Sequence, residues 1–124
     1  MRLVMLRAHL RQFAGTLLLL AIPLAVCTTR ATAADAEKGK GLYASRCAFC
    51  HGASGAGDGP AGKALKPPPT NFTLAAYWNS TTPQTVKEAI QNGKPNTAMM
   101  AFKNALTAEQ LDDLLAYLKT LGQP

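Results

Sequence analysis

The pentapeptide Cys47-Ala48-Phe49-Cys50-His51 is the most informative segment of this 124-residue chain. Two cysteines stand three positions apart, and a histidine follows the second one directly. On a helical turn, side chains at this spacing share one face. Both thiols can therefore add to the two vinyl groups of one haem while the imidazole faces the iron. C-x-x-C-H is the attachment pattern of haem c, so the sequence predicts one covalently bound haem at Cys47, Cys50 and His51.

Three other interpretations of the two cysteines are weaker. A thioredoxin-like dithiol belongs in a strand–helix–strand context, and the sequence shows no strand pattern. A structural zinc site normally needs four ligands, whereas no Cys or His follows His51. A disulfide between residues three positions apart would close a trivial loop. The haem interpretation is therefore favoured.

The first 33 residues have the layout of a secretory signal peptide. They hold four arginines and no acidic residue, and residues 13–26 form an uncharged stretch. This stretch is shorter than the roughly 20 apolar residues that a spanning helix needs. The small residues of Ala31-Thr32-Ala33 suit a signal peptidase, so we expect cleavage after Ala33. Residues 34–124 would then form a single domain.

Two alternatives remain for the N-terminal segment. It could stay attached as an uncleaved membrane anchor, or the chain could be a lipoprotein modified at Cys27, although Val26 is large for the position before such a cysteine. In every case the chain is expected to be exported to the periplasm, and an uncleaved signal would anchor it to the membrane. Haem c is attached after export, in an oxidising compartment, so the signal peptide supports the motif independently.

The positive charge of the chain resides mostly in the predicted signal peptide. The whole chain has a formal net charge of +6, whereas residues 34–124 hold nine Lys/Arg against seven Asp/Glu, a balance of +2. Two haem propionates would bring that domain close to neutral. The high isoelectric point is therefore no sign of nucleic-acid binding, and we expect none. A domain this small buries a modest core, and a covalently bound cofactor can add to its stability.

Three segments have the apolar spacing and end signals of helices: residues 36–46, 83–92 and 107–121. The last is the strongest, because Thr107 and Gln110 are spaced as a capping box and leucines recur at helical intervals. The Gly- and Pro-rich segments between them are expected to be loops. These patterns predict an all-α domain.

Met99 and Met100 are the main candidates for a second axial ligand of the iron. His51 is the last histidine of the chain, and His/Met ligation is a common arrangement in cytochromes. Adjacent side chains of an extended segment point in opposite directions, so one methionine would bind the iron while the other packs or is exposed. Core filling is the alternative role for a methionine, and lysine is a weaker candidate ligand.

The sequence resembles the class I cytochromes c over about residues 36–121. These small haem proteins have crossed N- and C-terminal helices. The matching parts are Gly39 and Tyr43, the haem motif with Gly52, the segment Gly93 to Phe102, and Leu111 to Leu121 with Tyr117. The resemblance implies the cytochrome c fold, with the N- and C-terminal helices packed around one covalently bound haem.

The resemblance also distinguishes the two methionines. In the related bacterial proteins the ligand methionine is followed by proline. Met99 falls on the ligand position and Met100 on the proline position. The resemblance therefore implies Met99 as the sixth ligand, and the missing proline leaves Met100 as a competitor.

Two further cofactor contacts are implied by the resemblance. A carbonyl from a proline-containing loop commonly orients the proximal histidine. Pro60, Pro68 and Pro69 are the possible sources, and we assign the role to Pro69. Trp78, and with it Tyr77, is expected to reach a haem propionate or to line the haem; simple packing is the alternative.

These expectations favour a one-electron carrier over an enzyme, because no acid–base group accompanies the iron. We expect a monomer that accepts electrons from a dehydrogenase or quinol-oxidising complex and passes them to an oxidase, reductase or peroxidase. Alternatives are a haem subunit of a larger oxidoreductase, or a sensor or enzyme with an open iron position. Four lysines would flank the haem edge and steer an acidic partner, or form an ordinary solvated surface: Lys63, Lys66, Lys94 and Lys103.

Overall fold

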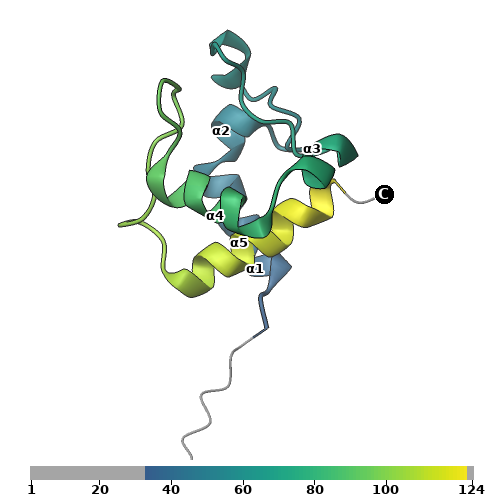
Figure 1. The fold of residues 1–124 in the computed structure, drawn as a ribbon, viewed down its shortest axis with the longest axis vertical. Helices are drawn as coiled ribbons and strands as arrows, with labels where there is room; N and C mark the ends of the chain where they lie inside the picture. Colours follow the sequence, from purple (N-terminus) through teal and green to yellow (C-terminus); the bar gives the residue numbers. More distant parts are fainter. Residues whose placement is uncertain (1–32, 123–124) are drawn as a thin grey trace, which may run out of the picture. The chain divides into compact units, whose positions relative to one another are not determined.

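The computed structural model describes residues 33–122, which form a helical domain (Figure 1). The predicted signal peptide, including Cys27, lies outside the described residues except for Ala33. The elements are α1 (Ala36–Arg46), α2 (Ala48–His51), η1 (Gly62–Ala64), α3 (Ala75–Ser80), α4 (Pro83–Asn92) and α5 (Ala108–Leu121). No strand occurs within residues 33–122, so the all-α class is confirmed. None of the helices in this range is long and apolar enough to cross a membrane.

The three helices predicted from end signals are α1, α4 and α5, and all three are confirmed. α5 begins at Ala108 because Thr107 is its cap. The Thr107 hydroxyl accepts a hydrogen bond from the Gln110 amide at 3.1 Å, and the Gln110 side chain accepts one from the Thr107 amide at 3.0 Å. At the start of α4, the Thr82 side chain accepts from the backbone N–H of the third helical residue. Local chemistry therefore sets these helix boundaries.

α3 was not predicted from the sequence. It has six residues, and Leu74, at its N-cap position, makes no side-chain capping bond. Its aromatic side chains instead pack on the loop before it: the Tyr77 and Trp78 rings lie 5.7 and 6.3 Å from the Phe72 ring, centroid to centroid. A helix this short is stabilised by tertiary packing rather than by its own propensity.

α1 crosses α5 (Figure 1), and Gly39 lies at their contact. A Cβ atom on Gly39 would overlap the backbone carbonyl of Asp113 in α5, so only glycine allows this approach. The Asp35 amide donates to the buried Asp113 carboxylate at 2.6 Å. One turn after Gly39, the buried Tyr43 ring packs on Tyr117 with 5.3 Å between centroids. The expected crossing of the N- and C-terminal helices is confirmed.

Two glycines of α1 provide a matched test of this crossing. Gly39→Ala is expected to lower the free energy of unfolding by about 1–3 kcal/mol, because the added methyl group overpacks the interface. Gly41 has no atom within 4 Å of its ideal Cβ position, so Gly41→Ala is expected to be neutral or stabilising by up to about 1 kcal/mol. Denaturant unfolding of the haem-loaded variants measures both, and equal effects would contradict a tight contact at Gly39.

The hydrophobic core lies between α1, α4 and α5 and continues into the loop before α3. Its buried members are Tyr43, Phe72, Val86, Ile90, Leu111, Leu114, Leu115 and Leu118. The predicted leucine stripe of α5 supplies half of this set. The core thus forms one wall of the region where α2 and the two long loops meet.

Candidate cofactor site

The cysteine–histidine motif follows α1 without a gap. The Cys47 amide donates to the Tyr43 carbonyl at 2.8 Å, which makes Cys47 the last residue in the hydrogen bonding of α1. The chain then continues as the single turn α2, in which the His51 amide donates to the Cys47 carbonyl at 2.9 Å. Cys47 and Cys50 are free, half-buried thiols, and His51 is 9% exposed. One helical turn therefore holds two thiols and an imidazole together.

Burial makes the Cys47 thiol a poor acid within the closed fold. Desolvation is the largest effect and raises the pKa of Cys47 to about 11, although the neighbouring Arg46 lowers it and Cys50 raises it further. The folded domain thus keeps this sulfur protonated at neutral pH.

A glycine-rich loop folds back over α2, and its backbone amides donate hydrogen bonds to the carbonyl groups of α2. The three acceptors are consecutive residues of the motif, and the donors come from the loop: Gly57 to His51 at 2.7 Å, Gly59 to Cys50 at 3.2 Å, and Ala61 to Phe49 at 3.1 Å. Orphan carbonyls at a helix end need such partners. The loop expected between residues 52 and 70 therefore supports the motif directly.

Tyr43 ties α1 to the residue that follows the motif. Its hydroxyl donates to the Gly52 carbonyl at 2.6 Å, and the side chain is 1% exposed. Burial raises the pKa of Tyr43 well above its usual value, with smaller contributions from Cys47, Tyr117 and Asp58. The hydroxyl therefore stays protonated and keeps donating across the neutral range.

Tyr43→Phe is expected to lower the free energy of unfolding by about 1–3 kcal/mol at pH 7, because the Gly52 carbonyl loses its buried partner. The raised pKa also predicts a pH effect. Ionisation is disfavoured in the fold but not in the unfolded chain, so stability contributed by Tyr43 is present below about pH 10 and lost as pH rises above it. Tyr43→Phe should remove that alkaline component, and denaturant midpoints from pH 7 to 11 measure it. A variant with an unchanged alkaline slope would contradict this account.

His51 is held by two contacts on one side. Its Nδ1 lies 3.1 Å from the Thr70 carbonyl oxygen, and its ring stacks on Phe72 with 4.9 Å between centroids and 22° between planes. Because a carbonyl can only accept, Nδ1 carries the proton and Nε2 has a free lone pair. Burial lowers the pKa of His51, an effect that the Thr70 bond partly offsets. The imidazole is therefore a neutral donor, the form that binds metals.

The predicted role of Pro69 is corrected by one residue, because the carbonyl on His51 belongs to Thr70. The Pro69 carbonyl instead faces Gly57: a Cβ on Gly57 would lie 2.6 Å from it, and Gly57 has a φ of 81° that favours glycine. Pro69 itself does line the larger cavity of the site. The sequence identified the loop but could not identify which carbonyl turns inward.

A cavity of about 290 Å³ opens beside the motif. Its walls come from α2, from the proline-rich loop and from the loop between α4 and α5, and most of them are apolar. A smaller inner cavity of about 20 Å³ extends toward the core, and Cys47, His51 and Met99 border both. The thiols, the neutral imidazole and a thioether thus surround one largely apolar space, a donor set that fits a haem.

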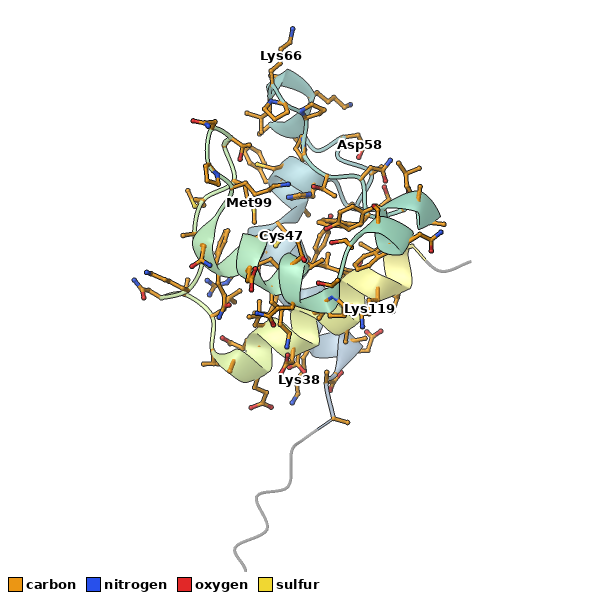
Figure 2. All side chains as sticks on the ribbon, in the orientation of Figure 1. Lys38, Cys47, Asp58, Lys66, Met99 and Lys119 are labelled. Carbon is orange, nitrogen blue, oxygen red and sulfur yellow. The ribbon has the colours of Figure 1, made fainter. Side chains whose placement is uncertain are left out.

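Met99 and Met100 occupy different positions in the loop. Met99 is partly buried and borders both cavities, whereas Met100 borders only the larger one and is 67% exposed. The Met99 amide donates to the Thr97 hydroxyl at 3.1 Å, and its carbonyl accepts from the Lys94 amide at 3.1 Å. Figure 2 shows Met99 reaching from this loop toward the region of Cys47. The geometry favours Met99 as the inward-facing thioether.

The expected position of Trp78 on the cavity wall is corrected by the structure. Trp78 borders neither cavity. Its indole N–H donates to the Phe72 carbonyl at 2.7 Å, and its ring packs against Tyr77 with 5.2 Å between centroids. The packing alternative therefore describes Trp78 better, with a hydrogen bond that the sequence did not indicate.

The basic residues at the cavity differ in part from the predicted set. All four expected lysines are exposed, but of these only Lys94 borders the larger cavity. Arg46 borders both cavities, and its guanidinium donates to the Ala105 carbonyl at 3.3 Å. Its position directly before Cys47 is the signal that could have identified it. Within residues 33–122, no cluster of three or more His, Cys, Asp or Glu side chains is placed to hold a metal ion.

Comparisons with known proteins identify the family of this chain. The profile of the family described as Cytochrome c matches residues 36–122. Cytochrome c-554(547) of Halothiobacillus neapolitanus is 39% identical over 92 residues, which cover 72% of this chain and 99% of that protein.

Three solved structures resemble the domain. The Kuenenia stuttgartiensis reducing HAO-like protein complex Kustc0457/Kustc0458 matches with a TM-score of 0.60 and 30% identity, over 73% of this chain and 44% of that one. Dihydro-heme d1 dehydrogenase NirN matches with a TM-score of 0.53 and 29% identity, over 66% of this chain and 16% of that one. The KustC0563 c-type cytochrome matches with a TM-score of 0.54 and 26% identity, over 68% of this chain and 98% of that one. The chain thus spans less than half of the first two structures and nearly all of the third.

Proposed function

Because the chain belongs to the cytochrome c family, with covalently bound haem c and a role in electron transfer, we propose that it is an exported carrier of single electrons. The observation that carries this proposal is the arrangement around one apolar cavity: two free thiols, a neutral imidazole and one inward thioether. In such a site His51 and Met99 would both bind the iron of a haem, and a haem held in this way would suit electron transfer rather than catalysis.

Each residue has a distinct part in the proposed mechanism. Cys47 and Cys50 would hold the cofactor by thioether bonds, and the bound haem would supply the one-electron chemistry. His51 would bind the iron through Nε2, while its Nδ1–H bond to Thr70 fixes the tautomer and makes the imidazole a stronger donor. Met99 would provide a soft thioether, which would favour the reduced state and raise the potential. The apolar cavity walls exclude water and limit reorganisation when the charge changes.

The cavity mouth is the proposed contact surface for redox partners. Arg46, Lys94 and the exposed Met100 border the larger cavity, so positive charge and an apolar contact lie together there. Such a surface suits an acidic partner, whose approach it would steer. We propose a dehydrogenase or a quinol-oxidising complex as the donor and an oxidase, reductase or peroxidase as the acceptor.

Export to the periplasm is proposed from the signal-like segment and from the start of the domain. Ala33 and Ala34 are exposed and non-helical, and α1 begins only at Ala36 with Asp35 as its cap. Cleavage after Ala33 would leave this cap intact. The mature protein would then be a single domain, residues 34–124.

A second candidate function is that of a haem subunit within a larger oxidoreductase. This is favoured by the match to a chain of a solved protein complex, of which this chain spans 44%, and to a dehydrogenase, of which it spans 16%. The free shuttle is favoured by the relative that it covers almost completely. Size-exclusion chromatography of extracts from the native cells separates the two: a free shuttle elutes at the size of one domain, and a subunit elutes with its complex.

The central experiment is expression of the full precursor with a haem c maturation system. We expect haem that stays with the denatured chain, sharp α and β bands on reduction, and the weak long-wavelength band of an iron–thioether bond when oxidised. Intact mass should place the first residue at Ala34. If haem is covalently bound but the weak band is absent, the assignment of Met99 as a ligand is wrong and the open-site alternative is favoured. Absence of covalent haem, under conditions that mature a control cytochrome, would refute the proposal.

A further inference from the structure

Both contacts that fix the His51 ring come from one short segment, residues 70–72. The Thr70 carbonyl accepts from Nδ1 at 3.1 Å, and the Phe72 ring stacks on the imidazole at 4.9 Å and 22°. A shift of this segment would therefore change the hydrogen bond and the stacking together. The position of residues 70–72 determines how strongly the histidine is held.

The segment is itself held by two short hydrogen bonds to the backbone groups of Phe72. The Phe72 amide donates to the Gly55 carbonyl at 2.7 Å, within the loop that covers α2. The Phe72 carbonyl accepts from the Trp78 indole N–H at 2.7 Å, from α3. The remaining side-chain bonds here are local to the turn, from Thr73 to Asn71. Among the described residues, Trp78 is thus the side chain other than His51 itself that ties residues 70–72 to a helix by a hydrogen bond.

The indole is confined where it lies. Its ring packs on Phe72 and Tyr77, with centroids 6.3 and 5.2 Å away. On another side it meets the end of α5, where a Cβ atom on Gly122 would overlap the indole nitrogen. Because an indole has a single donor and no acceptor, this enclosure directs its one N–H at the Phe72 carbonyl. Figure 1 shows α3 beside the C-terminal end of α5.

We propose that Trp78 is a positioning residue for the proximal histidine and thereby sets the reduction potential, although it borders neither cavity. It holds the Phe72 carbonyl, which keeps the Thr70 carbonyl on Nδ1 and the Phe72 ring on the imidazole. A firm Nδ1–H bond makes the imidazole a stronger donor and stabilises ferric iron. Loss of the indole N–H is therefore expected to favour the ferrous state. The inference rests on His51 as the iron ligand.

Trp78→Phe tests the proposal in the haem-loaded full protein, because it keeps an aromatic ring and removes only the donor and part of the ring area. The ferric–ferrous equilibrium against a mediator should shift about two- to tenfold toward the reduced form, the range expected for weakening one hydrogen bond. In ¹⁵N-edited NMR of the reduced protein, the His51 Nδ1 proton should exchange with water several-fold faster. A packing role alone would lower stability and change neither quantity.

Tyr77→Phe is the matched control, because it removes a hydroxyl from the same aromatic cluster without touching the Phe72 carbonyl. It should leave the equilibrium and the exchange rate at the wild-type values. If Trp78→Phe does not mature, Gly122→Ala displaces the indole while keeping its N–H, and it should shift the equilibrium in the same direction. Wild-type potential and exchange in either of these two variants would overturn the proposal. Loss of haem ligation by His51 would instead appear in the wild-type spectrum.

Discussion

Met99→Ala is expected to retain covalent haem but to become high-spin, with a reduction potential lower by roughly 0.2 V, a fraction of the range of about 0.8 V that axial ligands span. The thioether of Met99 borders both cavities of the site. Without it, the iron loses a soft ligand that stabilises the ferrous state. Absorption spectra report the spin state, and a redox titration reports the potential.

Met100→Ala is the matched control for this result. The Met100 side chain is 67% exposed and does not border the inner cavity. Its removal should leave a low-spin spectrum and a nearly unchanged potential. The ligand assignment would be reversed if the Met100 variant became high-spin while the Met99 variant stayed low-spin.

The double substitution Cys47→Ser and Cys50→Ser is expected to abolish covalent haem and to prevent accumulation of folded protein. Without thioether bonds, haem can leave and expose a cavity of about 290 Å³ beside the core. Exposing these apolar walls to water costs about 25 cal/mol per Å² of apolar surface, which weighs heavily on the small net stability of a domain of this size. Haem staining of a denaturing gel reports the bond, and circular dichroism reports the fold.

Phe49→Ala is the control within the same motif. The Phe49 side chain is 68% exposed and borders neither cavity, although it lies between the two cysteines. This variant should stain for haem and fold like the wild type. A haem-stained band from the double serine variant would show that the protein holds its cofactor by another covalent bond.

The elements that sequence reasoning predicted correctly are those whose causes are local. The capping box at Thr107 and the proline that opens α4 act within one turn, so their residues alone determine where each helix begins. Gly39 was identified through its spacing from Tyr43, and its contact with α5 is confirmed. In patterns of this kind, the spacing of the residues is enough to predict the local structure.

The elements that sequence reasoning missed depend on how a loop turns. Three consecutive prolines precede Thr70, and which carbonyl faces His51 depends on the path of the loop against Gly57, not on residue type. α3 is too short for a periodic pattern and has no capping bond. Trp78 was recognised as notable, but its partner is a backbone carbonyl, which no sequence motif encodes.

The crossing of α1 and α5 has a consequence for the timing of maturation. The hydrogen bond between Asp35 and Asp113 joins positions 78 residues apart, and α5 follows α1 to α4 in the chain. Contacts between distant segments form late. The two cysteines come many residues before α5, the helix that completes their surroundings. Until that helix arrives, the thiols are accessible; afterwards burial raises the pKa of Cys47 to about 11. Because the attachment motif lies near the start of the domain, its thiols can react during the interval before the fold closes.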